Sequence, residues 1–168
     1  MTTNAERQML RQTVAALVDK HAGPEAVRRA MDSERGYDES LWNTLCEQVG
    51  AAALVVPDDL GGAGGELADA AVVLEELGRG LVPTPLFGTT LAEFALMAAT
   101  SPDTDTLEQL ASGERIGTVV FDPEYVINGD IAAAVTFPPS TYRGIVEGGA
   151  IEVAGRVSGF EADKGEEI

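Results

Sequence analysis

The chain has 168 residues, of which 28 are acidic and 11 are basic, so its net charge at pH 7 is −17. This charge disfavours non-specific binding to nucleic acid or to an anionic membrane surface, because both are polyanions. No apolar run reaches membrane-spanning length and the first residues lack the apolar core of a signal peptide, so we expect a cytoplasmic protein. The 45% of hydrophobic residues suffices for a folded core.

Apolar residues recur at helical spacing through the amino-terminal part of the chain. Pro24 suits the first turn of a helix, Asp38 an N-cap, and Gly50 the position just after a helix end. Asp105 and Glu108 are expected to cap the last helix in the manner of a capping box. The predicted helices cover residues 5–20, 24–31, 39–49, 66–79, 86–99 and 106–111.

The character of the sequence changes at Gly113, where β-branched runs replace helical periodicity. Strands are predicted over 116–121, 131–137 and 151–157. The fold class is therefore mainly α with a β-strand C-terminal part. We expect an N-terminal helical domain over residues 1–112 and the start of an incomplete β domain over residues 113–168.

The glycine-rich segment 61–65 invites comparison with loops that bind phosphate through backbone N–H groups. Such a loop needs a lysine and a hydroxyl residue after its last glycine, and here Glu66 and Leu67 follow. A dinucleotide-binding fold would place the glycines between a strand and a helix, whereas helices are predicted on both sides. We interpret the segment as a structural turn.

Isolated titratable residues do not form a catalytic or metal-binding constellation. His21 is the only histidine and Cys46 the only cysteine, which excludes an intrachain disulfide and a cysteine-based metal cluster. We interpret His21 as a solvated residue at a helix end and Cys46 as a packing residue. Glu75 and Glu76 are adjacent on a helix and point in different directions, so we expect them on a solvated face. We assign no catalytic residue and no metal ligand.

Five sequence segments in a fixed order say more about function than these patterns do. They are LWNTLCEQVGAAALVVP (41–57), DDLGGAGG (58–65), AAVVLEELGRGLVPTP (70–85), TTLAEFALMA (89–98) and LASGERIGTVVFDP (110–123). This succession resembles the amino-terminal part of the flavin-dependent acyl-CoA dehydrogenases, well over residues 5–123 and weakly beyond.

The resemblance implies an FAD-dependent α,β-dehydrogenation of an acyl-CoA thioester. In this family a carboxylate removes the α-proton while the β-hydrogen leaves as hydride to the flavin. The family fold is a helical domain, a β domain and a second helical bundle, with FAD between the last two. The resemblance also implies a homo- or hetero-oligomer with other acyl-CoA dehydrogenase subunits.

The sequence departs from the family where FAD is expected. The family's first β strand ends in Thr-Glu-Pro before a Gly-Ser-Asp turn, whereas here Phe121-Asp122-Pro123 stands alone. The family's Trp-Ile-Thr flavin segment has no counterpart, and its catalytic glutamate belongs to the second bundle. Only backbone contacts around Phe121 are therefore carried over as cofactor-binding.

Three interpretations stay open. The chain is part or a subunit of an FAD-dependent enzyme, a non-catalytic structural subunit of a heteromeric dehydrogenase, or a free-standing helical binding domain whose strands pair with another chain. The substrate stays equally open between a fatty acyl-CoA and a steroid side chain.

Overall fold

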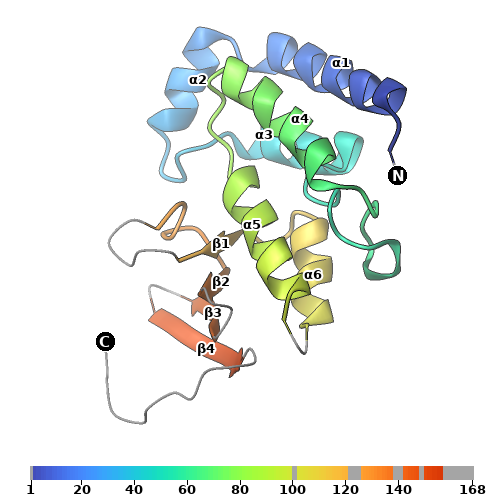
Figure 1. Cartoon of the computed structure of the whole chain (residues 1–168). Helices are drawn as coiled ribbons and strands as arrows, with labels where there is room; N and C mark the ends of the chain where they lie inside the picture. Colours follow the sequence, from blue (N-terminus) through green and yellow to red (C-terminus); the bar gives the residue numbers. More distant parts are fainter. Residues whose placement is uncertain (1, 100–101, 121–125, 138–141, 148–149, 157–168) are drawn as a thin grey trace.

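The computed structural model describes residues 2–99, 102–120, 126–137, 142–147 and 150–156. It shows a layer of helices with a small sheet at one end, next to α5 (Figure 1). The predicted fold class is confirmed. The helices are α1 (Asn4–His21), α2 (Pro24–Met31), α3 (Glu39–Thr44), α4 (Leu67–Arg79), α5 (Leu86–Met97) and α6 (Thr104–Ala111), with a π-helical turn η1 (Leu45–Val49) and a 3₁₀ turn η2 (Asp58–Leu60).

The core of the helical layer lies where α1, α3 and α4 meet. Val14 of α1, Leu45 of η1 and Val73 of α4 are fully buried and belong to one apolar cluster with Trp42. A second cluster lies between α5, α6 and the sheet, around Leu96 and other buried apolar residues. Burial of these side chains is the main favourable contribution to folding.

The predicted helix over 39–49 is divided into an α-helix and a wider turn. Asp38 caps α3 as expected, because its carboxylate accepts a hydrogen bond from the Leu41 amide at 3.0 Å. The last turn opens into the π-helix η1, which Gly50 closes in the left-handed conformation at φ 69°. The amides of Gly50 and Ala51 reach back to carbonyls of Cys46 and Leu45 and end the helix.

The predicted start of the last helix is wrong. Asp103 is the N-cap of α6, and its carboxylate accepts hydrogen bonds from the amide and the hydroxyl of Thr106 at 3.0 and 2.9 Å. Asp105 and Glu108 are exposed and do not cap the helix. The cap falls at Asp103 because its extended backbone directs the carboxylate towards the third residue of the helix.

The sheet has four strands in the order β1-β2-β3-β4. β1 runs parallel to β2, and the other neighbours are antiparallel. Three strands were predicted with longer or shifted bounds, whereas β3 was missed because a glycine interrupts its β-branched pattern. The strands are β1 (Gly117–Val119), β2 (Ala134–Phe137), β3 (Tyr142–Glu147) and β4 (Ala150–Arg156).

One junction joins the helical layer to the chain that enters the sheet. The indole Nε1–H of Trp42 donates to the carbonyl oxygen of Gly113 at 3.1 Å. Gly113 has φ +76°, and a Cβ at this position would overlap the side chain of Cys46. Both observations require glycine here, because other residues are strained in this conformation and would collide with η1.

We therefore expect Gly113→Ala to lower the free energy of unfolding by about 1–3 kcal/mol, since it combines backbone strain with overpacking. Gly78→Ala is the matched control, because Gly78 lies in α4 and its added Cβ would meet no atom within 4 Å. It should raise the free energy of unfolding by about 0.5–1 kcal/mol. Urea titrations followed by helical circular dichroism measure both changes, and equal effects would contradict this account of the junction.

Candidate functional site

The strand expected to lead to FAD lies directly against α5. The Gly117 amide donates to Oγ1 of Thr89 at 3.2 Å, so a buried side chain of α5 holds the start of β1. A Cβ on Gly88 would lie 3.0 Å from the Gly117 carbonyl oxygen, which shows how closely the helix approaches the strand. Phe121 lies outside the described residues, so its backbone contact with FAD stays a prediction.

A side chain of β1 holds the loop that follows this strand. Thr118 is fully buried, and its hydroxyl donates to the Ile127 carbonyl at 2.6 Å. The amide of Ala132 donates to the Asn128 carbonyl at 2.9 Å and completes a turn before β2. The strand is therefore held both from α5 and from the segment that returns to the sheet.

The sequence analysis does not predict that α5 carries a buried acid. The side chain of Glu93 is 0% exposed, and neither carboxylate oxygen has a hydrogen-bond partner among the described residues. Burial raises the pKa of Glu93 to about 9, so this carboxyl is neutral at pH 7. Its signal in the sequence is a single acidic residue within the otherwise uncharged segment 86–99.

The expected solvated face is confirmed for Glu75 and is wrong for Glu76, because α1 packs beside α4. Arg11 of α1 contacts Glu75 at 2.8 Å and Glu76 at 2.9 Å. Glu76 is buried, whereas Glu75 is half exposed and also pairs with Arg79. Hydrogen bonds from Arg11 and then Arg79 lower the pKa of Glu75. These carboxylates fasten two helices and are not an acid–base pair.

A second ion pair fixes the other end of α4. Asp69 is 2% exposed, and its carboxylate accepts from Arg7 Nε and from the Thr2 hydroxyl, both at 2.8 Å. The Glu66 amide also donates to this carboxylate, at 2.8 Å. Burial favours the neutral acid, but the hydrogen bonds from Glu66, Arg7 and Thr2 outweigh it and lower the pKa of Asp69.

The glycine-rich segment is a structural turn, as predicted. The amides of Ala63, Gly64 and Gly65 donate to the carbonyls of Ala53, Val56 and Leu54 at 2.7–2.8 Å. A Cβ on Gly62 would overlap the Val56 backbone, so glycine is needed for this close approach. Because these amides are used within the chain, they do not form a phosphate-binding loop.

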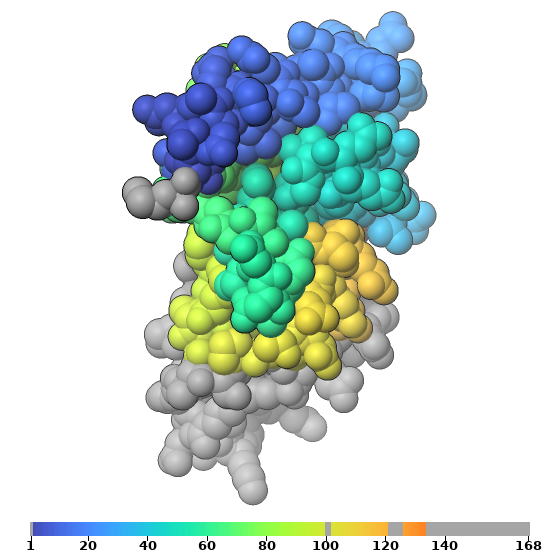
Figure 2. Space-filling model, turned by 90° about the vertical axis from the view of Figure 1, so that its right-hand side faces the viewer, coloured from blue at the N-terminus to red at the C-terminus, as the bar shows by residue number. Residues whose placement is uncertain are grey.

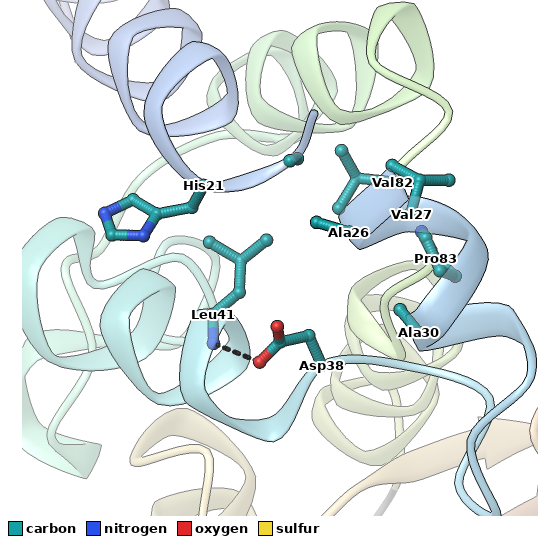
Figure 3. A pocket seen from close by; sticks show the side chains of 9 residues that line it. His21, Ala26, Val27, Ala30, Asp38, Leu41, Val82 and Pro83 are labelled. Carbon is teal, nitrogen blue, oxygen red and sulfur yellow. Dashed lines mark hydrogen bonds between the residues drawn. The ribbon is translucent and has the colours of Figure 1, made fainter. Parts of the chain in front are cut away.

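His21 and Cys46 also take the expected roles. His21 is exposed at the end of α1, beside a shallow apolar hollow between α1, α2 and α3 (Figure 3). Asp38 lies across this hollow and turns its carboxylate to the Leu41 amide. The hollow has a volume of about 10 Å³, the space of a single water molecule. Cys46 packs against the core, and burial raises its pKa to about 12.

A larger open groove of about 400 Å³ lies between residues 35–43, 113–116 and 131–133. Arg35 at its rim pairs with Glu39 at 3.0 Å and donates to the Tyr37 hydroxyl at 3.3 Å. Arg115 and Glu114 also line it, so its lining holds two basic and two acidic residues. This charge balance does not select an anionic ligand.

Comparison with known proteins places the chain in a family. Residues 4–114 match the family model of the acyl-CoA dehydrogenase N-terminal domain. The chain is 70% identical over 135 residues to acyl-CoA dehydrogenase IpdE2 of Mycobacterium tuberculosis. That match covers 80% of this chain and 42% of the relative. The chain therefore belongs to the acyl-CoA dehydrogenase family, an FAD-dependent oxidoreductase family, and it spans less than half the length of this relative.

Solved structures agree with this assignment. The Tcur3481-Tcur3483 steroid ACAD, a G363A variant, matches with a TM-score of 0.72 and 26% identity over 86% of this chain and 48% of that chain. The ChsE4-ChsE5 complex from Mycobacterium tuberculosis matches with the same TM-score and identity over 89% and 48%. Within the described residues, no helix is long and apolar enough to cross a membrane, and no group of three or more metal-ligating side chains occurs.

The ion pair at Asp69 predicts an acid-sensitive contribution to stability. Because the pKa of Asp69 is lowered on folding, its stabilisation is present above its ordinary pKa of 3.8 and is lost as the pH falls through the folded value. We expect Asp69→Asn to cost about 2 kcal/mol at pH 7 and to flatten the acid limb of the stability profile.

Glu66→Gln is the matched control, because Glu66 pairs with the same arginine but its side chain is 46% exposed. It should change the free energy of unfolding by about 0.5 kcal/mol or less. Urea unfolding from pH 7 down to pH 3 tests both variants. An Asp69→Asn profile parallel to that of the unmodified chain would contradict the assigned role.

Proposed function

We propose that this chain is part or a subunit of an FAD-dependent acyl-CoA dehydrogenase, which introduces a double bond between the α and β carbons of an acyl-CoA thioester. The chain is not catalytically complete alone and acts with a further helical part, supplied by a longer form of the chain or by another subunit. One observation beyond the family match carries this proposal, namely the uncovered apolar side of α5.

α5 is apolar around nearly its whole circumference, a composition typical of a helix enclosed on all sides. One side packs against β1 and α6. On the other side Phe87 is 47% exposed, Phe94 is half-buried and Ala98 just beyond the helix is exposed, whereas Leu91 and Ala95 pack against the second apolar cluster. α5 reaches the surface beside α6 in Figure 2. We define Phe87, Phe94 and Ala98 as the outer face of α5.

The outer face of α5 supports docking of an apolar helical partner. Such a partner would bury one side of the helix whose other side holds β1, the strand that leads to Phe121. The carboxylate base that the family requires would then come from that partner, because we assign no catalytic residue to this chain. The role of this chain is to hold β1 in place through Thr89 and Trp42.

The residues preceding Phe121 are compatible with backbone contacts to FAD. The Thr89 hydroxyl oxygen accepts from Gly117, and the Thr118 hydroxyl donates to Ile127, so these side chains are engaged within the chain. β1 is an edge strand of the described sheet, which leaves backbone groups on its outer side. FAD, when bound, supplies the hydride acceptor of the reaction.

A non-catalytic structural subunit is the second candidate function. Phe121-Asp122-Pro123 replaces the family's Thr-Glu-Pro, which removes the hydroxyl expected next to the flavin. One similar solved structure is a complex of two named proteins, ChsE4 and ChsE5, which supports a hetero-oligomeric arrangement here. The other is a steroid ACAD, which favours a steroid-derived acyl-CoA as substrate over a fatty one.

The outer face of α5 can be tested by charge insertion. The chain is co-purified with the part of Mycobacterium tuberculosis IpdE2 that the match does not cover, and acyl-CoA oxidation is followed with an artificial electron acceptor. We expect Phe87→Asp to abolish co-purification and activity while circular dichroism stays unchanged, because a buried charge disfavours docking.

Met9→Asp is the matched control, because Met9 is 63% exposed on α1, away from α5. It should leave co-purification and activity unchanged. Equal losses in both variants, or none in either, would show that the outer face of α5 is not the docking surface. Assembly without acyl-CoA oxidation would favour the structural subunit.

A further inference from the structure

Glu93 is enclosed between the two apolar clusters of the helical layer. Leu86, about two helical turns earlier on α5, belongs to the first cluster, and Leu96 belongs to the second. The side chain is 0% exposed, and both carboxylate oxygens lack a hydrogen-bond partner among the described residues. A charged carboxylate without a partner is strongly disfavoured in such surroundings.

Among the residues that the structure describes, no cationic side chain pairs with Glu93. Burial is the sole cause of its altered pKa, so the ion pairs of α4 do not compensate for it. Cys46 of η1 interacts electrostatically with Glu93. Burial raises the pKa of the Cys46 thiol, and a negative charge on Glu93 raises it further. Titratable groups lie on three of the elements around α5, and none lies on β1 or β2. They are Cys46 and Glu47 of η1, Asp69, Glu75, Glu76 and Arg79 of α4, and Asp103, Asp105 and Glu108 at α6.

We propose that Glu93 is a proton-dependent stability switch, in which the neutral carboxyl lets α5 pack against η1 and β1 and its ionisation loosens this packing. The folded chain keeps a proton on Glu93 at neutral pH, whereas the unfolded chain has released it. This inference does not depend on the proposed function, although α5 and β1 are the elements that the function uses.

The direction of the effect follows from proton linkage. The pKa of Glu93 rises from 4.5 to about 9 on folding, so the folded state binds the proton more tightly. The contribution of Glu93 to stability is therefore greatest below pH 4.5 and falls as the pH rises towards 9. Within this window each pH unit lowers the folding equilibrium constant about tenfold through this group. The Cys46 thiol contributes only above its ordinary pKa of 9.

The test compares the full chain with Glu93→Gln between pH 6 and pH 8, using urea unfolding at each pH. Glutamine keeps the shape of the side chain but does not ionise. We expect the ratio of the folding constant of Glu93→Gln to that of the unmodified chain to rise about a hundredfold across these two pH units. Glu108→Gln, at an exposed position on α6, should give a ratio that stays constant.

A ratio for Glu93→Gln that does not change with pH would overturn the proposal. Glu93→Leu provides a second variant without an ionisable group, and the same rise in its ratio is expected. If neither variant folds at any pH in this range, Glu93 is required for folding rather than opposed to it, and the proposal is wrong. Hydrogen exchange of the α5 amides then shows where the chain opens. In the unmodified chain only, the exchange rate of these amides should increase with pH by more than the intrinsic chemical rate does.

Discussion

The hydrogen bond from the Trp42 indole to the Gly113 carbonyl is the constraint on which the arrangement of helices and sheet depends. It joins residues 71 positions apart and fixes the chain just before β1. Gly113 has no side chain to collide with Cys46, so the chain passes close to η1 and reaches the side of α5. From there Thr89 holds Gly117, and the strand that leads to the expected flavin contact is held at a defined place on the helical layer.

Much of the helical layer could be predicted from the sequence because its helices are amphipathic and their ends carry local signals. Asp38 and Gly50 fulfil their predicted capping roles within their own helix. The burial of Glu76 could not be predicted, because Arg11 lies 65 residues away in the sequence and meets it only after α1 packs on α4. The strand β3 was missed for a different reason, since Gly144 interrupts its β-branched pattern although its pairing with β2 and β4 is local.

The candidate site was predicted only through the ordered family motifs. Its distinctive features are two properties of α5 that are unusual in a stable domain. An apolar helix with an uncovered outer face and a buried acid that pairs with no described residue does not satisfy the usual rules for a stable single domain. The sequence shows that Glu93 is alone among apolar residues, but burial and the missing partner emerge only from the packing of η1, α5 and β1. α5 therefore affects both the stability of the fold, through Glu93, and the proposed assembly, through its outer face.

The central claim is that this chain contributes to FAD binding only in combination with a second part. The visible absorption spectrum of the purified chain, alone and after co-expression with the remaining part of the IpdE2 relative, tests it most directly. The account predicts a colourless chain alone and flavin absorbance in the co-purified assembly. An assembly that forms but stays colourless would contradict it, and flavin absorbance from the chain alone would show that no second part is needed.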